Sequence, residues 1–511
     1  MVFRVSAAAA EFLERLAQEL EVPASRYEEA ESRYHSVGDW LNRDESSLKE
    51  HSPDVYVQGS FRLGTPIRPV NHTEHYDIDL VCELSLGKHQ VSQKELKDKL
   101  GVEMKSYAER YGMKSADEGR RCWTLDYAEG AQFHLDALPA IPDGEGRHIA
   151  LESLQLSVEW AKSAIAITDT ENESYSERTA AWPHSNPRGF TEWFRSRMKV
   201  VFDDRRLRIA TEAHANVEDV PAYRVKTPLQ QVVQILKRHR DIRFSDKAEL
   251  KPISVIITTL AARAYANQPD LPEALASILE NMDVHIQLRG GVYWIENPTD
   301  PAENFADRWQ SNPERKDAFF EWLQWAKKDF EAIADKDDPQ LVMESAAVAV
   351  GDALARKVQA GTSQTPSPSG ALSLFGRAVT VLAAPHRQRP PWPTGHVGKV
   401  SIARTRTFRN GFRPEALLHD AAPLKKGVAL EFSAKTDVRK PYEVYWQIVN
   451  TGLEAKLSSA LRGDFSTGVI IKGEILHKED AAYTGAHSVE CFIVKDGSLA
   501  ARSGAFIVNV E

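Results

Sequence analysis

Two short stretches of the sequence combine residue types that bind phosphate groups and divalent cations. Gly59 and Ser60 follow one apolar run, and Asp77 and Asp79 lie two residues apart inside another. Successive side chains of a strand point to opposite faces, so both carboxylates are expected on one face of a strand over 76–84. Adjacent carboxylates repel each other unless a cation neutralises them, and Mg²⁺ favours oxygen ligands while leaving room for substrate phosphates.

The Gly-Ser pair supplies the other half of this pattern. Gly59 lets the backbone approach a phosphate closely, and Ser60 offers a hydroxyl and an amide at a predicted helix start. Taken separately, both features have simpler interpretations, because Gly-Ser pairs are common in turns and an Asp-x-Asp pair can be a solvated strand end. In this order, they predict a phosphate-binding turn followed by a metal-binding strand.

A third carboxylate, Asp136, lies on the second strand of a predicted β-hairpin over 122–138. Polar and apolar residues alternate there, so Asp136 faces the same cleft as Asp77 and Asp79 if the two strands are neighbours. A pair of metal ions needs more anionic ligands than two carboxylates supply. The three aspartates together are therefore the predicted catalytic and metal-binding residues.

Two further candidates lie on predicted helices later in the chain. Lys237 follows the apolar stripe of a helix predicted within 223–241, and Ser254 lies in the first turn of a helix predicted over 251–263. Both could close over a triphosphate from the side opposite the metals. Spacing alone favours a simpler interpretation, a solvated charge run and an N-terminal cap.

Four regions of different pattern are expected to position these residues. Helical periodicity over 6–49 predicts helices that brace the catalytic sheet, and residues 94–111 are a further predicted helix. Several short strands near the C-terminus favour a β-sandwich. The expected domains are the N-terminal helices with the catalytic sheet at 1–188, a helical domain at 189–356, a Pro- and Ser-rich linker at 357–397 and the strand-rich domain at 398–511.

Composition limits the class of protein. A chain of 511 residues is long enough for two or three domains with their own cores, and a net charge of -9 argues against a generally basic surface for coating nucleic acid. The three cysteines form no CxxC pair, which favours a reducing, cytoplasmic setting. We expect no membrane association, because no apolar run is long enough to cross a bilayer and the N-terminus lacks the apolar core of a signal peptide.

The order of Gly59-Ser60, Asp77-x-Asp79 and Asp136 resembles that of the DNA polymerase beta-like nucleotidyltransferases. With the Lys-Thr-Pro-Leu-Gln and Lys-Pro-Ile-Ser-Val-Ile-Ile-Thr-Thr-Leu stretches, residues 59–263 resemble the bacterial cyclic-oligonucleotide synthases. These are the CD-NTase or SMODS family, relatives of animal cyclic GMP-AMP synthase and oligoadenylate synthase. The last stretch, with Tyr445-Trp-Gln-Ile-Val-Asn-Thr-Gly, is similar to the AGS-C sensor domain.

The resemblance implies an α+β fold, with a nucleotidyltransferase palm and a helical domain in a bilobal arrangement, followed by a C-terminal β-sandwich. It implies that Asp77 and Asp79 hold two Mg²⁺ ions, with Mn²⁺ as an alternative, and that Asp136 completes one metal site. Gly59 and Ser60 would bind nucleotide. By the same resemblance, Lys237 and Ser254 match the family's Lys and Ser that bind the triphosphate tail.

The function implied by the resemblance is the condensation of ATP and other NTPs into a cyclic di- or trinucleotide messenger with release of pyrophosphate. The messenger would gate an effector protein in anti-phage (CBASS-type) defence, and the C-terminal domain would receive a phage-derived or cellular trigger. Three alternatives stay open: a linear 2'-5' oligoadenylate synthase, an RNA or protein nucleotidyltransferase, and a catalytically silent nucleotide or phage-ligand sensor.

The sequence departs from the family pattern of the animal enzyme at two places. Val255 follows Ser254 where the animal enzyme has an aromatic residue that stacks on a base, so the base platform is unidentified. No zinc-binding insertion is visible, and a double-stranded DNA activator is therefore not expected.

Overall fold

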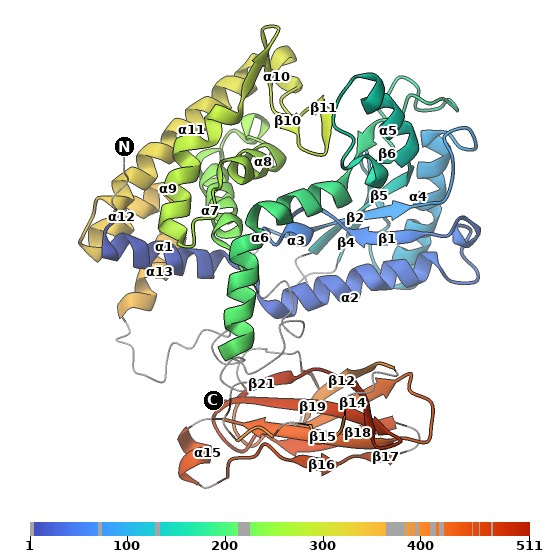
Figure 1. Cartoon of the computed structure of the whole chain (residues 1–511), viewed down its shortest axis with the longest axis vertical. Coiled ribbons are helices and arrows are strands. Elements are labelled where there is room, and N and C mark those ends of the chain that lie inside the picture. Colours follow the sequence, from blue (N-terminus) through green and yellow to red (C-terminus); the bar gives the residue numbers. More distant parts are fainter. Residues whose placement is uncertain are drawn as a thin grey trace. The chain divides into compact units, whose positions relative to one another are not determined.

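A computed structural model gives the fold of most of the chain (Figure 1). It describes residues 5–69, 74–127, 133–212, 225–363, 384, 386–388, 390–393, 398–408, 415–417, 424–451, 453–458, 460–471 and 474–510. The chain divides into one unit of residues 1–203 with 226–364 and a second of 204–225 with 365–511. Each unit is described by itself.

The first unit contains a mixed seven-stranded sheet in the order β1-β2-β5-β4-β3, with β6 pairing with β5 and β7. Its strands are β1 (Asp54–Val57), β2 (Tyr76–Glu83), β3 (Asp117–Glu118), β4 (Trp123–Asp126), β5 (Phe133–Pro142), β6 (Ile165–Ile167) and β7 (His184–Ser185). The antiparallel pairing of β4 with β5 confirms the predicted hairpin, whose turn lies outside the described residues. β2 and β5 run parallel as neighbours, so the strands that carry the aspartates are adjacent.

The helices of the N-terminal region are α1 (Ala7–Leu20), α2 (Ala24–Leu41), α3 (Gly59–Leu63), α4 (Gln93–Arg110) and α5 (Gly144–Ser153). α2 packs on the sheet, as the sequence predicts, and α4 packs on it as well. The expectation that α1 also braces the sheet is wrong. Its buried residues, among them Phe12 and Leu16, belong to the core of the helical half, because its apolar face packs against α7, α9 and α12.

The helical half consists of α6 (Pro187–Glu212), α7 (Pro228–Arg243), α8 (Ser254–Ala264), α9 (Leu271–Asn281), α10 (Arg308–Ser311), α11 (Pro313–Ala334), α12 (Pro339–Val350) and α13 (Asp352–Ser363). α7 lies at its centre and is buried over most of its length. The helix begins at a capping box in which the Thr227 hydroxyl accepts from the Gln230 amide, with Pro228 in the first turn.

Two small hairpins interrupt the helical half and were not predicted from the sequence. They are β8 (Gln287–Arg289) with β9 (Val292–Trp294), and β10 (Glu296–Asn297) with β11 (Asp300–Asn304). The second hairpin is fixed to the palm, since Arg147 on α5 forms an ion pair through two nitrogens with the buried carboxylate of Asp300. A charge pair of this geometry holds one orientation.

The second unit is a β-sandwich, which confirms the predicted fold class. One sheet has the order β13-β12-β14-β18-β17, and the other has β16-β15-β19-β20 with β21 beside β19. The strands are β12 (Val400–Phe408), β13 (Glu415–Ala416), β14 (Ala429–Thr436), β15 (Glu443–Asn450), β16 (Phe465–Thr467), β17 (Val469–Ile471), β18 (Glu474–Asp480), β19 (Gly485–Lys495), β20 (Ser498–Arg502) and β21 (Phe506–Val510), with one helix, α15 (Leu453–Leu457). Trp446 is fully buried between the sheets.

The boundaries of the predicted linker, 357–397, differ from the extent of the ordered elements. α13 continues to Ser363, with Val358 buried in the helical core. At the other end, Trp392 packs its ring against Tyr445 at 4.5 Å and Phe465 at 5.1 Å between centroids. Trp392, although it lies in the Pro-rich segment, therefore packs as part of the sandwich.

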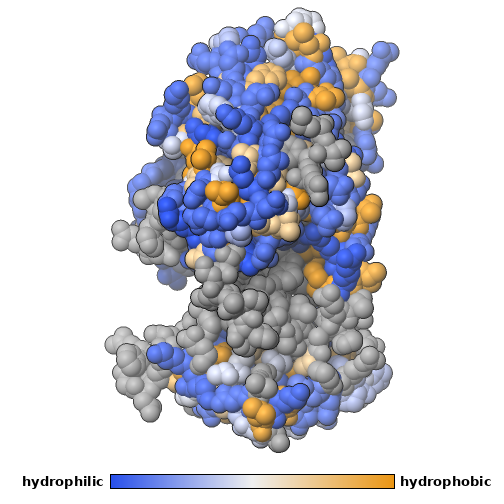
Figure 2. All heavy atoms as spheres, turned by 90° about the vertical axis from the view of Figure 1, so that its left-hand side faces the viewer, coloured by the Kyte–Doolittle hydropathy of each residue, from blue (hydrophilic) through white to orange (hydrophobic). Residues whose placement is uncertain are grey.

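The surface of the first unit is mostly hydrophilic on the face shown in Figure 2, where hydrophobic residues form small separate spots. In the part of the chain that the structure describes, no helix is both long and apolar enough to cross a bilayer.

Candidate active site

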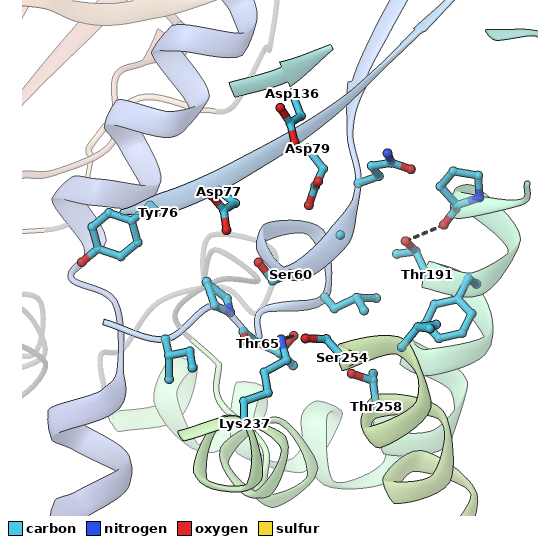
Figure 3. Close-up of a pocket in the computed structure, with 18 of the residues that line it drawn as sticks. Ser60, Thr65, Tyr76, Asp77, Asp79, Asp136, Thr191, Lys237, Ser254 and Thr258 are labelled. Atoms are coloured by element: carbon cyan, nitrogen blue, oxygen red, sulfur yellow. Dashed lines mark hydrogen bonds between the residues drawn. The ribbon is translucent and has the colours of Figure 1, made fainter. Parts of the chain in front are cut away.

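A cavity of about 750 Å³ lies between the palm sheet and the helices α6, α7 and α8. All seven candidate residues from the sequence line it: Gly59, Ser60, Asp77, Asp79, Asp136, Lys237 and Ser254. In Figure 3 the three aspartates lie on the sheet side, while Lys237 and Ser254 lie across the cavity from them, with Ser60 between. The structure thus brings together residues that are up to two hundred positions apart.

The three carboxylates come from the two parallel neighbours β2 and β5. Asp79 and Asp136 are directly paired in the register, and Asp77 lies two residues before Asp79 on the same face. Asp136 is oriented by Thr124 on β4, whose hydroxyl donates to Oδ1 at 2.5 Å. Asp136 also lines the cavity.

Gly59 is required by the position of Asp79. Its φ is +63°, a left-handed conformation, and an added Cβ would lie only 2.1 Å from Oδ2 of Asp79. The backbone amide of Gln58 also donates to the carbonyl of Asp79 at 2.8 Å. The Gly-Ser turn therefore packs directly on the second aspartate, and any side chain at position 59 would displace that carboxylate.

Crowded negative charge sets the electrostatics of this side of the cavity. Burial, with added repulsion from Asp136 and Asp77, raises the pKa of Asp79 to about 7. The pKa of Asp77 is raised by the same kind of burial and by Asp136, and lowered by His134. The side chain of Asp77 is 72% exposed, so water screens its repulsion from the neighbouring carboxylates more than it does for Asp79. Asp79 is the group that most needs a neutralising partner.

The donor set fits hard divalent cations. Carboxylate oxygens are the ligands that Mg²⁺ prefers, and substrate phosphates usually complete its coordination. Among the residues that the structure describes, no three His, Cys, Asp or Glu side chains are already arranged around a metal position. The three aspartates would therefore hold ions together with the phosphates of a nucleotide, and not as a closed protein cage.

Lys237 is buried on the opposite side of the cavity. Its ammonium donates to the carbonyl of Thr65 at 3.0 Å and lies 3.4 Å from the Thr65 hydroxyl. Burial, then repulsion by Arg240, lowers its pKa to about 8, while Asp241 and Asp79 oppose this shift. The side chain is thus a positive charge held at one point near the Gly-Ser turn, which suits a triphosphate.

Ser254 is the first residue of α8 and is exposed to the cavity. Its hydroxyl accepts a hydrogen bond from Arg240 at 2.8 Å, so a cation already orients it. The amides of the first turn and the hydroxyl together face the cavity, as an anion site at a helix start requires. The simpler interpretation as a side-chain cap is not what the structure shows, since this helix has no side-chain cap.

A polar stripe on α7 also shapes the site and was missed in the sequence. Gln230 donates to the carbonyl of Leu63, and Gln234 donates to that of Pro66. With Lys237 on Thr65, these bonds fix the segment after the Gly-Ser turn along the helix. The spacing of Gln230, Gln234 and Lys237 follows one helical face, and that periodicity is the signal that could have revealed it.

Two family models match the chain. The nucleotidyltransferase domain of cyclic GMP-AMP synthase DncV-like proteins matches residues 53–139, which carry the Gly-Ser turn and all three aspartates. The adenylyl/guanylyl and SMODS C-terminal sensor domain matches residues 382–511, the sandwich.

Known proteins are similar over most of both chains. A protein of Roseivirga ehrenbergii named c-di-GMP synthase is 28% identical over 61% of this chain and 76% of its own. The cyclic dinucleotide synthase CdnG of Bradyrhizobium diazoefficiens is 25% identical over 64% and 76%. A solved structure of the latter, a CD-NTase in complex with GTP, superposes with a TM-score of 0.53 at 22% identity, covering 70% of this chain and 99% of that one.

The palm and helical fold and these matches define the protein as a nucleotidyltransferase enzyme. More narrowly, both family models and the named relatives support the CD-NTase family that the sequence predicts, with a C-terminal match to the AGS-C sensor domain.

Neutralising Asp79 should stabilise the metal-free protein. The Asp79→Asn variant removes a buried charge that Asp77 and Asp136 repel, so its unfolding temperature in EDTA at pH 8 is expected to rise by about 3 to 6 °C. Adding MgCl₂ should raise that of the wild type and have little effect on the variant. Asp117→Asn on exposed β3 is the matched control, and an Asp79→Asn variant less stable than wild type in EDTA would contradict the charge argument.

Nucleotide affinity should fall above the pKa of Lys237. That amine is charged below about pH 8 and neutral above it, and only the ammonium attracts a triphosphate. We expect the KM for NTP to rise about fivefold between pH 8 and pH 9, with a smaller change in kcat, because the charged fraction of Lys237 falls by that factor. In Lys237→Met, KM should be high at pH 7 and independent of pH through this window. Steady-state pyrophosphate release measures both, and a wild-type KM that is flat across it would sink the assignment.

Proposed function

We propose that the protein condenses nucleoside triphosphates into a cyclic di- or trinucleotide, with two Mg²⁺ ions as cofactors. The observation that carries the proposal is the single cavity in which Asp77, Asp79 and Asp136 face Lys237 and Ser254. A ribose hydroxyl of one nucleotide attacks the α-phosphate of the next, the bond to the β-phosphate breaks, and pyrophosphate leaves. A last attack within the linear product closes the ring.

The names of the relatives support this product class. Proteins named c-di-GMP synthase and cyclic dinucleotide synthase are each matched over 76% of their length. Guanine nucleotides are thus among the expected substrates, along with ATP. Mn²⁺ is expected to replace Mg²⁺, because both accept oxygen ligands.

The residues of this chain have separate tasks in the proposed reaction. Asp77 and Asp79 would hold the ions, which neutralise the charge that develops on the α-phosphate and on the oxygens that attack and leave. Lys237 and Ser254 hold the triphosphate tail in line with the attack. Asp136 would accept the proton of the attacking hydroxyl. Positioning supplies much of the rate in such a displacement.

The other candidate functions make different products from the same centre. A linear 2'-5' oligoadenylate synthase leaves a terminal triphosphate that phosphatase removes, whereas a cyclic product has no free phosphate end. An RNA or protein nucleotidyltransferase needs a macromolecular acceptor. A silent sensor would bind nucleotide without releasing pyrophosphate.

For the biological role, we propose a messenger for anti-phage defence that gates an effector protein in the cytoplasm. The C-terminal match to a sensor domain is the support for a trigger that acts on this enzyme. This step rests on family analogy and not on a site.

In the Asp77→Ala and Asp79→Ala variants, the rate of product formation should fall by about a thousandfold or more, because the metal ions lose a ligand. The assay uses labelled NTPs and digests the products with nuclease and phosphatase. Thin-layer chromatography and mass spectrometry then measure the product that resists digestion. Asp117→Asn on β3 should retain full activity. A cyclic product from either alanine variant would rule out the assigned centre.

Removing residues 365–511 should keep basal synthesis and abolish its induction, because the catalytic cavity lies wholly within the first unit. Mass spectrometry of messenger in phage-infected cells that produce the full or the shortened chain measures this. A shortened enzyme that is still induced by infection would remove the sensor role from the sandwich.

A further inference from the structure

The wall of the catalytic cavity away from the sheet contains a carboxylate that the proposed reaction does not use. Glu303, on β11, lines the main cavity together with Phe305, and both residues also line an adjoining cavity of about 470 Å³. Glu303 is therefore placed where the two cavities meet. A charged group at such a place can contact a bound nucleotide from the side.

The carboxylate of Glu303 is held rigidly and keeps one oxygen available. The buried amide of Asn297 donates from Nδ2 to Oε2 at 2.6 Å. The orientation of Asn297 is itself fixed, since its Oδ1 accepts from the amide and the hydroxyl of Thr299 at 2.9 and 3.0 Å. Within the described part of the chain, the Glu303 side chain makes no other hydrogen bond, so Oε1 and the second lone pair of Oε2 can each accept one more.

Two aromatic rings stand beside this acceptor. Phe305 and Phe190 both line the main cavity, and their ring centroids are 6.3 Å apart at 68°. Because the two rings meet edge to face, one ring can offer its flat face to a nucleic acid base while the other contacts the edge of that base. These rings could replace the base-stacking aromatic residue that the animal enzyme has at the position of Val255.

The Glu303 carboxylate has few positive charges around it. Burial, the largest effect, raises the pKa of Glu303, and Asp300 adds to this shift, while the Asn297 hydrogen bond, Arg121 and His184 oppose it in part. Arg121 is itself paired with Asp169 at 2.9 Å. No ion pair with Glu303 exists among the described residues, so the carboxylate has no protein cation of its own.

We propose that Glu303 reads a guanine base in the catalytic cavity, with Phe305 and Phe190 as its stacking surface. Guanine presents two adjacent donors, N1–H and the N2 amino group, whereas the corresponding edges of adenine and cytosine each pair a donor with an acceptor and that of uracil has one donor between two acceptors. Only guanine can donate twice to one carboxylate. This inference rests on the proposed nucleotidyl transfer and names its base selection.

The hairpin that carries Glu303 is anchored well enough for selection. The ion pair of Arg147 with Asp300 fixes β11 to the palm. Asn304 accepts from the amide of Ile295, just before β10, and donates to the carbonyl of Tyr293 on β9. A recognition group on a rigid element discriminates better than one on a loose loop, because a wrong base cannot be accommodated by movement.

The Glu303→Gln variant tests the inference with an isosteric change. Asn297 would keep donating to the new carbonyl oxygen, so the new NH₂ group would point into the cavity and meet the guanine N1–H. We expect kcat/KM for GTP to fall about tenfold to a hundredfold, and that for ATP to stay within about twofold or rise. Wild type should prefer GTP over ITP, which lacks the N2 amino group, and the variant should lose that preference.

Glu296→Gln, on the same hairpin but outside both cavities, is the matched control and should leave the GTP to ATP ratio unchanged. Binding of α,β-methylene GTP and α,β-methylene ATP to the full chain by calorimetry gives the same comparison without turnover. If neither nucleotide reacts but the variant still loses only the GTP analogue, the proposed function fails and the base reading stands. Equal losses for both analogues, or an unchanged preference, would overturn the inference.

Discussion

The structure of the catalytic unit depends on the crowding of negative charge on β2 and β5. Parallel pairing of these strands places Asp79 beside Asp136, and burial leaves Asp79 with a pKa near 7 when no cation is present. A protein gains nothing in stability from such an arrangement, because each carboxylate raises the cost of ionising the next. In the proposed reaction, bound cations and phosphates would offset this repulsion, and nucleotide binding would then stabilise the palm.

In the proposed function, the helical half would hold the other end of the nucleotide. Its central helix, α7, contacts the segment after the Gly-Ser turn through Gln230, Gln234 and Lys237, each bonded to a backbone carbonyl. These bonds cross between the two halves, so the triphosphate site and the carboxylates are fixed at one separation. Hydrogen bonds to backbone carbonyls tolerate changes in the contacted side chains, and the arrangement therefore depends on α7 more than on the exact sequence of 63–68.

Much of the catalytic side could be predicted from the sequence, because it follows simple periodicities. Alternation on strands places Asp77, Asp79 and Asp136 on one face, and helical spacing locates α7 and α8. The sequence could not reveal that α1 packs in the helical half. An apolar stripe shows which face of a helix is buried, but it does not show which element covers that face. It also did not reveal why position 59 is glycine, because the reason lies in the contact with Asp79, twenty residues further on.

The selective side of the cavity escaped prediction for a related reason. The strands of the β10–β11 hairpin, Glu296–Asn297 and Asp300–Asn304, are short and mostly polar. They contain no alternation of polar and apolar residues long enough to predict a strand. Its conformation is set by tertiary contacts, among them the ion pair of Asp300 with Arg147 from far away in the sequence. Catalysis needs residues on regular strands that hold ions at fixed spacing. Base selection needs only one acceptor and a stacking surface, which an irregular element can supply and can change without disturbing the metal centre.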